Sequence, residues 1–135
     1  MNEQATEWSH LPNAAHIDWI IQDVEPNPSD WDAVWWAARD TARDAARDTV
    51  WDAAFEAANG AVWDAVWDAV AGAGRDAGDG YLAAYHACFA LIAYDHAGAL
   101  FDIPVEQVRV MADLGQPAAI LMLPACEVRA MRDLG

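Results

Sequence analysis

Residues 30–76 read DWDAVWWAARDTARDAARDTVWDAAFEAANGAVWDAVWDAVAGAGRD. Through most of this stretch a Trp, Arg or Phe is followed by Asp or Glu every four residues, as in Trp31-Asp32 and Trp63-Asp64. Ala, Val and Thr occupy most of the other positions, and residues 29–103 contain no proline. Because Ala-rich sequence without proline favours α-helix over β-strand, the repeat predicts helical structure.

The four-residue period also limits how the repeat can pack. Four residues turn an α-helix by about 400°, so each repeat advances about 40° around the helix axis. No single face can therefore be buried along the whole stretch. Asn59-Gly60 could end a helix, although the acidic positions continue in phase from Glu56 to Asp64. We therefore expect residues 29–71 to form either one long acidic helix or a two-helix hairpin.

A short helix is expected to precede the repeat, over residues 13–24. Ile17, Ile20 and Val24 are spaced three or four apart, which is typical of the buried stripe of a helix. Asn13 stands at the start of this pattern and suits the N-cap position, where its side chain would accept a backbone hydrogen bond.

The remaining segments complete an all-α domain of 135 residues. Residues 1–12 are polar and predict a loosely ordered arm, and the glycines of residues 72–80 predict a hinge. Residues 81–135 have denser apolar periodicity and predict a compact helical cluster, with a helix stop at Gly115 and a last helix that Pro124 opens or kinks. We expect a long Ala/Trp/Asp tetrad-repeat helix or helical hairpin packed on this C-terminal cluster.

The composition is strongly acidic, with 22 acidic and 7 basic residues and a net charge of −15. Such a balance disfavours direct binding of nucleic acid or of an anionic membrane surface, and it favours basic partners. The longest strongly apolar run, residues 118–123, is too short to span a bilayer. Cys88 and Cys126 form no C-x-x-C pair and no basic-then-apolar leader opens the chain, so we expect buried, reduced thiols in a cytosolic protein.

The repeat supplies the candidate functional residues. Its carboxylates could form an ordered negative surface that captures a basic protein, and the alternative is a solvated face that keeps the helix soluble. The candidate partner-binding residues are Asp32, Asp40, Asp44, Asp48, Asp52, Glu56, Asp64 and Asp68. The aromatic residues could pack in the core, along a homo-oligomer seam or against a partner. They are Trp31, Trp35, Trp36, Trp51, Phe55, Trp63 and Trp67.

The chain offers no convincing catalytic or metal-binding pattern. On one helix, His86 and Asp95 would lie on opposite faces, and His86 and His96 would be about 80° apart, so the three cannot converge on a metal without help from His10 or His16. We expect these histidines to be satisfied core residues. Cys88 has no visible base to activate it. We therefore expect a protein without enzymatic activity, metal or cofactor.

Two sequence segments outside the repeat resemble a known group of proteins. The first is LPNAAHID at residues 11–18, and the second runs from ALIAYDH at residues 90–96 to GQPAAILMLPA at residues 115–125. With the repeat, they resemble uncharacterised small proteins of tailed bacteriophages. The resemblance implies a protein that acts in the cytoplasm of an infected bacterium, and it implies no activity.

Charge and setting together predict a phage accessory protein that binds and inhibits or redirects a basic host protein, in anti-defence or host takeover. Nucleic-acid mimicry is one form that this could take, and self-association into a homo-oligomer is expected. One alternative is a structural or assembly protein that uses the long helix as an oligomer seam. Another is a small-molecule-binding protein or an enzyme.

Overall fold

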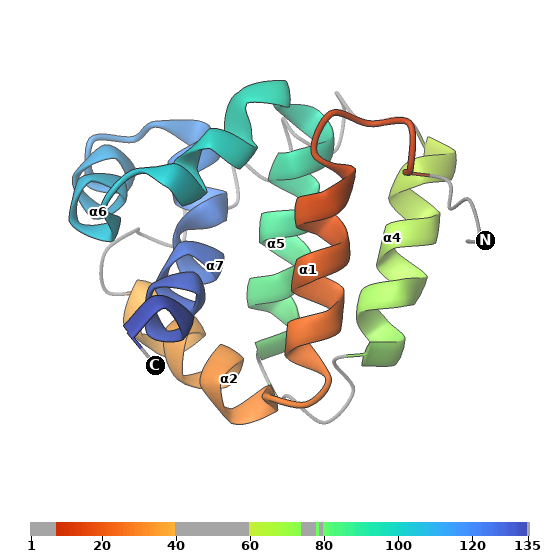
Figure 1. The fold of residues 1–135 in the computed structure, drawn as a ribbon, viewed down its shortest axis with the longest axis horizontal. Helices are drawn as coiled ribbons and strands as arrows, with labels where there is room; N and C mark the ends of the chain where they lie inside the picture. Colours follow the sequence, from red (N-terminus) through yellow and green to blue (C-terminus); the bar gives the residue numbers. More distant parts are fainter. Residues whose placement is uncertain (1–7, 40–59, 74–77, 79, 135) are drawn as a thin grey trace.

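The computed structural model describes residues 8–39, 60–73, 78 and 80–134, and all regular structure in this part of the chain is helical (Figure 1). The all-α prediction is therefore confirmed. The choice between one long helix and a hairpin depends on residues 40–59, which lie outside the described residues. The elements are α1 (Ala14–Val24), α2 (Pro28–Arg39), α4 (Gly60–Ala73), α5 (Gly80–Ala93), the 3-10 helix η1 (Asp95–Asp102), α6 (Val105–Asp113) and α7 (Pro117–Leu134).

Helix α5 is the centre of the fold. Its sequence, GYLAAYHACFALIA, has no polar face, and most of its side chains are buried. A helix that is apolar all round has to be covered on every side. In the structure α1, α2, α4 and α7 all pack against α5, which Figure 1 shows behind α1 and between α7 and α4.

Helix α1 covers one face of α5 with the stripe that the sequence predicts. Ile17, Ile20 and Val24 are fully buried, and Ile21 is half-buried. The remaining face carries polar side chains such as Gln22, which is exposed. The spacing of apolar residues therefore correctly predicts which side of α1 faces the core.

Asn13 does not have the predicted role. It makes no side-chain cap for α1, and it is only 5% exposed, the one buried polar residue of the described chain. Its Nδ2 donates to the backbone oxygens of Leu91 (3.0 Å), Tyr94 (3.2 Å) and Asp95 (3.1 Å). These carbonyls lie at and just beyond the end of α5, where a helix leaves backbone acceptors without partners. Asn13 therefore satisfies the end of α5 rather than the start of α1.

The beginning of the described chain differs from the expected arm. Trp8 is buried in the core, and its indole nitrogen donates to Oδ1 of Asp18 at 2.9 Å. The side chain of Trp8 thus holds residues 8–12 against α1. No apolar periodicity in the sequence predicts that this ring is buried. Residues 1–7 lie outside the described residues.

Pro124 lies within the last helix. The sequence predicts that it opens or kinks this helix, and α7 runs through Pro124 without ending, so the first of these two alternatives is wrong. Pro124 is itself buried, and packing of α7 on both α5 and α6 holds the helix together across it. Gly115 ends α6 as predicted, with φ at +90° and its N–H donating to the oxygen of Ala112.

The buried amide of Asn13 gives a test of the contact that ends α5. Asn13→Ala removes the side-chain donor that the oxygens of Leu91, Tyr94 and Asp95 share, and Tyr94 keeps only its bond from the N–H of Ala97, so we expect the variant to lower the free energy of unfolding by about 1–3 kcal/mol. Urea denaturation followed by circular dichroism measures the loss. Gln22→Ala, on the exposed face of α1, should change stability by less than about 0.5 kcal/mol. Equal stability of the two variants would show that the amide is dispensable.

Gly80, the first residue of α5, lies against the backbone of α2. A Cβ atom at this position would lie 2.6 Å from the backbone nitrogen of Asp32 and 2.8 Å from the carbonyl carbon of Trp31. Because backbone cannot move aside like a flexible side chain, Gly80→Ala should cost about 1–3 kcal/mol of stability. At Gly72 a Cβ meets nothing within 4 Å, so Gly72→Ala should be neutral or stabilising by up to about 1 kcal/mol. Thermal unfolding of both variants checks the expected order, and the reverse order would refute it.

Candidate functional site

The structure describes three of the eight predicted acidic site residues. Asp64 and Asp68 lie on α4 and are exposed, and Asp32 lies on α2 and is half-buried. Both helices pack against α5. The other predicted acids lie outside the described residues: Asp40, Asp44, Asp48, Asp52 and Glu56.

Helix α4 shows how the tetrad repeat meets the core. Val62, Val66 and Val70 face inward and are buried. Trp63 is 6% exposed, whereas Trp67, one repeat later, is 40% exposed. This difference matches the advance of about 40° per repeat, which turns each successive Trp further from the core.

The rings of α4 meet aromatic side chains of α5. Trp63 stacks on Phe89, and the ring of Trp67 stands edge-on to Tyr85 with centroids 4.1 Å apart. Burial raises the pKa of Tyr85 well above its ordinary value, because the charged phenolate would lose its hydration between these rings. These contacts hold the acidic face of α4 at a fixed orientation on the core.

The predicted aromatic residues divide between core and surface. Trp31 and Trp35 of α2 are buried, and the indole nitrogen of Trp31 donates to Oδ1 of Asp23 at 3.0 Å. Trp36 is 50% exposed. Trp51 and Phe55 lie outside the described residues. Packing in the core is therefore shown for part of the predicted aromatic residues, namely Trp31, Trp35 and Trp63.

The described arginine side chains are engaged within the fold. Arg109 donates from Nε and Nη2 to the two carboxylate oxygens of Glu127, at 2.6 and 2.7 Å. Arg129 places its guanidinium 4.9 Å from the ring centroid of Trp19 and 5.2 Å from that of Phe101. Arg132 binds two carboxylates. None of these three arginines makes an ion pair with the acids of α4.

Arg132 joins the last helix to the first two. Its Nε and Nη2 donate to the carboxylate of Asp23 at 2.8 and 2.6 Å, and its Nη1 donates to Oδ2 of Asp30 at 2.9 Å. Burial by itself would raise the pKa of Asp23, but the hydrogen bonds from Arg132, Trp31 and Asn27 outweigh it, and the pKa lies below its ordinary value. Sequence reasoning missed this network because 109 residues separate Arg132 from Asp23.

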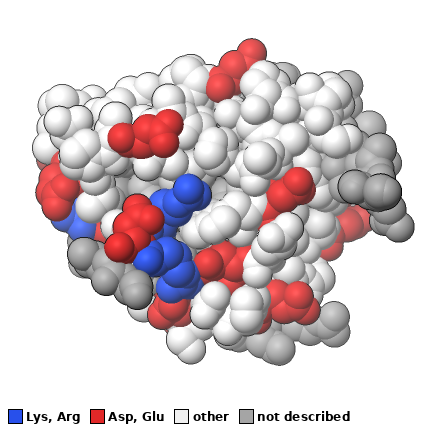
Figure 2. Space-filling model, viewed as in Figure 1, with Lys and Arg blue, Asp and Glu red and all other residues white. Residues whose placement is uncertain are grey.

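The resulting surface carries more negative than positive charge. Figure 2 shows acidic side chains spread over the viewed face, while the arginines gather on one side of it. Asp95, Asp102 and Asp113 are exposed in addition to the acids of α4. Among the described residues, exposed acidic side chains therefore lie outside the tetrad repeat as well as on it.

The candidate catalytic and metal residues do not converge. His86 is half-buried, and its Nδ1 bonds with the oxygen of Leu82 at 2.6 Å. His96 is exposed, which corrects the expectation of a core histidine there. Burial raises the pKa of the Cys88 thiol far above its ordinary value, so it is not poised as a nucleophile. Among the residues that the structure describes, no group of three His, Cys, Asp or Glu side chains could hold a metal ion.

Comparison with known proteins gives no relative. No family model, no curated protein and no solved structure matches the chain. Within the described part of the chain, every helix is too short or too polar to cross a membrane. The resemblance to small phage proteins therefore stays a prediction.

The Asp23–Arg132 pair gives a pH-dependent test. Since the pKa of Asp23 is lower in the folded protein, its ion pair stabilises the fold fully above the ordinary pKa of 3.8 and is lost as the pH falls through the folded value. Asp23→Asn should therefore cost about 1.5–3 kcal/mol near pH 7, and less near pH 3, which lies below the ordinary pKa of 3.8, because protonation of this carboxyl in the unfolded chain reduces the stability that the ion pair contributes.

Urea denaturation at both pH values measures this difference. Asp95→Asn is the matched control, because Asp95 is exposed and contacts none of the described arginines. Its effect should stay below about 0.5 kcal/mol at either pH. A penalty for Asp23→Asn that does not shrink in acid would mean that the carboxylate charge is not what stabilises the contact.

Proposed function

We propose that this protein is a non-enzymatic binding protein that captures a basic partner protein through its acidic surface. The observation that carries the proposal is that Asp64 and Asp68 are exposed on α4, whereas the described arginine side chains are engaged elsewhere. In the setting that the phage resemblance implies, the partner is a basic host protein in the cytoplasm of an infected bacterium. Its inhibition or redirection would serve anti-defence or host takeover.

Long-range electrostatics support this proposal. A net charge of −15 on a chain of this size attracts positively charged proteins and repels nucleic acid and anionic membranes. Such attraction accelerates encounter and weakens with salt, because the Debye length falls from about 10 Å at 0.1 M to about 3 Å at 1 M.

Trp67 supplies an apolar contact next to the charges. Its ring rests against Tyr85 and is 40% exposed, and Asp68 follows it in the chain. Tryptophan contributes strongly to protein interfaces when a partner covers it. A basic partner could therefore bind the carboxylates of α4 and cover the ring at the same time.

Removal of the two α4 charges tests the proposed surface. Asp64→Asn/Asp68→Asn should reduce capture of basic proteins from a bacterial lysate by about 2- to 30-fold at low salt, because exposed charge pairs contribute about 0.2–1 kcal/mol each. Capture by the wild-type protein should disappear at about 0.5 M salt. Immobilised protein and quantitative mass spectrometry of the retained fraction measure both effects.

The control is Asp95→Asn/Asp113→Asn, which removes the same charge from η1 and α6. If both double variants lose capture equally, the α4 face is not the binding surface and only the net charge matters. If wild-type capture is unchanged at high salt, the electrostatic proposal is wrong.

A second candidate is a structural or assembly role with α4 in an oligomer seam. The observation that favours it is the exposed part of Trp67, since a second copy could cover this ring. Self-association that persists at high salt and is lost in Trp67→Ala would support the assembly role. Analytical ultracentrifugation of both proteins makes the distinction.

A further inference from the structure

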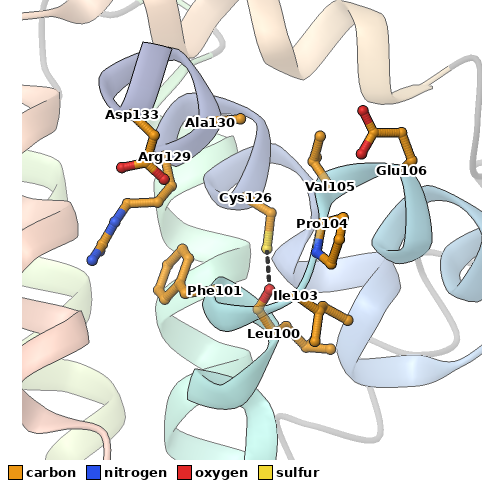
Figure 3. Close-up of a pocket in the computed structure, with 10 residues that line it drawn as sticks. All are labelled: Leu100, Phe101, Ile103, Pro104, Val105, Glu106, Cys126, Arg129, Ala130 and Asp133. Carbon is orange, nitrogen blue, oxygen red and sulfur yellow. Dashed lines mark hydrogen bonds between the residues drawn. The ribbon is translucent and has the colours of Figure 1, made fainter. Parts of the chain in front are cut away.

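A pocket of about 300 Å³ lies between η1, the start of α6 and the C-terminal half of α7 (Figure 3). Its walls are mainly apolar, with Phe101, Ile103, Val105 and Cys126 among the side chains that line it. This volume is at the lower end of the range for small-molecule sites. The pocket therefore suits one extended side chain or a ligand of similar size.

The interior of the pocket offers no charge. Cys126 donates from Sγ to the backbone oxygen of Leu100 at 3.7 Å, and Figure 3 shows the thiol directed toward that oxygen. Burial raises the pKa of Cys126 to about 12, so the thiol is protonated at neutral pH. An aliphatic group is the occupant that such walls accept without loss of hydrogen bonds.

Two carboxylates stand at the rim. Glu106 comes from the first turn of α6 and Asp133 from the last turn of α7, and both are exposed. Neither makes an ion pair with an arginine of the described chain. Arg109, one turn after Glu106, is held by Glu127 through two hydrogen bonds, and Glu127 is the main cause of its raised pKa, with a smaller electrostatic contribution from Glu106.

Arg129 is the one cation among the lining residues. Its guanidinium lies near the rings of Trp19 and Phe101, and Figure 3 shows it directed away from Val105 and Glu106. The rim therefore carries two carboxylates and one guanidinium, which gives it a net negative charge. A cationic head is therefore favoured over an anionic one at the mouth of the pocket.

We infer that this pocket receives a lysine or arginine side chain of the basic partner. The aliphatic stem would contact Val105, Ile103 and Phe101, and the cationic head would lie between Glu106 and Asp133. Long basic side chains combine these two parts, an apolar stem and a charged end. The inference rests on the proposed function, because it names the group of the partner that this chain recognises.

Small probes test the pocket without a partner. We expect n-butylguanidinium, which reproduces the stem and head of arginine, to shift the amide resonances of Ile103, Val105 and Cys126 in ¹⁵N-labelled full-length protein, in a saturable manner. Pentanoate has a similar chain and the opposite charge, and it should produce no saturable shift at these residues. Equal binding of the two probes, or no binding of n-butylguanidinium, overturns the inference.

Variants separate charge from shape. Glu106→Gln/Asp133→Asn should weaken n-butylguanidinium binding at least about fivefold, whereas Asp95→Asn/Asp113→Asn should leave it within about twofold. Ala130→Phe fills the pocket without removing a charge, and it should abolish probe binding. Circular dichroism verifies that each variant retains its helix content.

Capture of basic proteins distinguishes this inference from the proposed function. If wild-type protein captures a basic partner and Ala130→Phe reduces that capture at least about fivefold, the pocket receives the partner. If capture is salt-sensitive but unchanged in Ala130→Phe, the pocket assignment is wrong and the proposed function stands. If wild-type protein captures no basic protein, the proposed function fails and the pocket assignment fails with it.

Discussion

The burial of most of α5 is the constraint on which the rest of the structure depends. This helix has no polar face, so α1, α2, α4 and α7 have to surround it. The alanines of α5 allow the neighbouring helices to pack close to it, because their side chains are small. Four of them are fully buried: Ala83, Ala84, Ala87 and Ala90. The tryptophans of the surrounding helices supply much of the apolar area that such small residues cannot bury.

Two polar contacts complete this arrangement, and both join distant parts of the chain. Asn13 satisfies carbonyl oxygens at the end of α5, and Arg132 ties the end of α7 to Asp23 and Asp30. Leaving such partly buried groups without partners is costly, so each contact restricts which packing of the helices is acceptable. Apolar burial brings the helices together, and these polar contacts select one arrangement among the many that would bury similar area.

The sequence predicts the parts of this structure that depend on local pattern. The Ala-rich repeat without proline predicts helices, the spacing of Ile17, Ile20 and Val24 predicts the inner face of α1, and Gly115 predicts the end of α6. Long-range features could not be predicted in this way. Asn13 has the chemistry of an N-cap and finds its partners about 80 residues away, at the end of a different helix.

The difference between local pattern and long-range contacts also explains the outcome at Pro124 and in the candidate site. Proline disfavours a helix interior by about 3 kcal/mol, but burial of α7 against α5 and α6 outweighs that local preference. In the site, the acidic period predicted exposed carboxylates, and Asp64 and Asp68 are exposed. No pattern in the sequence could show that Arg109, Arg129 and Arg132 would be engaged within the fold, because their partners come from other elements or distant segments.

The repeat length links the aromatic and acidic surfaces. A repeat of 3.6 residues would keep every Trp on the core side, whereas a repeat of four turns each Trp about 40° further toward solvent. The change from buried Trp63 to partly exposed Trp67 follows from this geometry. Asp68 follows Trp67 directly in the chain, so the ring that the repeat turns toward solvent is followed by an exposed carboxylate. Among the described residues, the geometry of the repeat therefore exposes one indole and two carboxylates on α4, those of Trp67, Asp64 and Asp68.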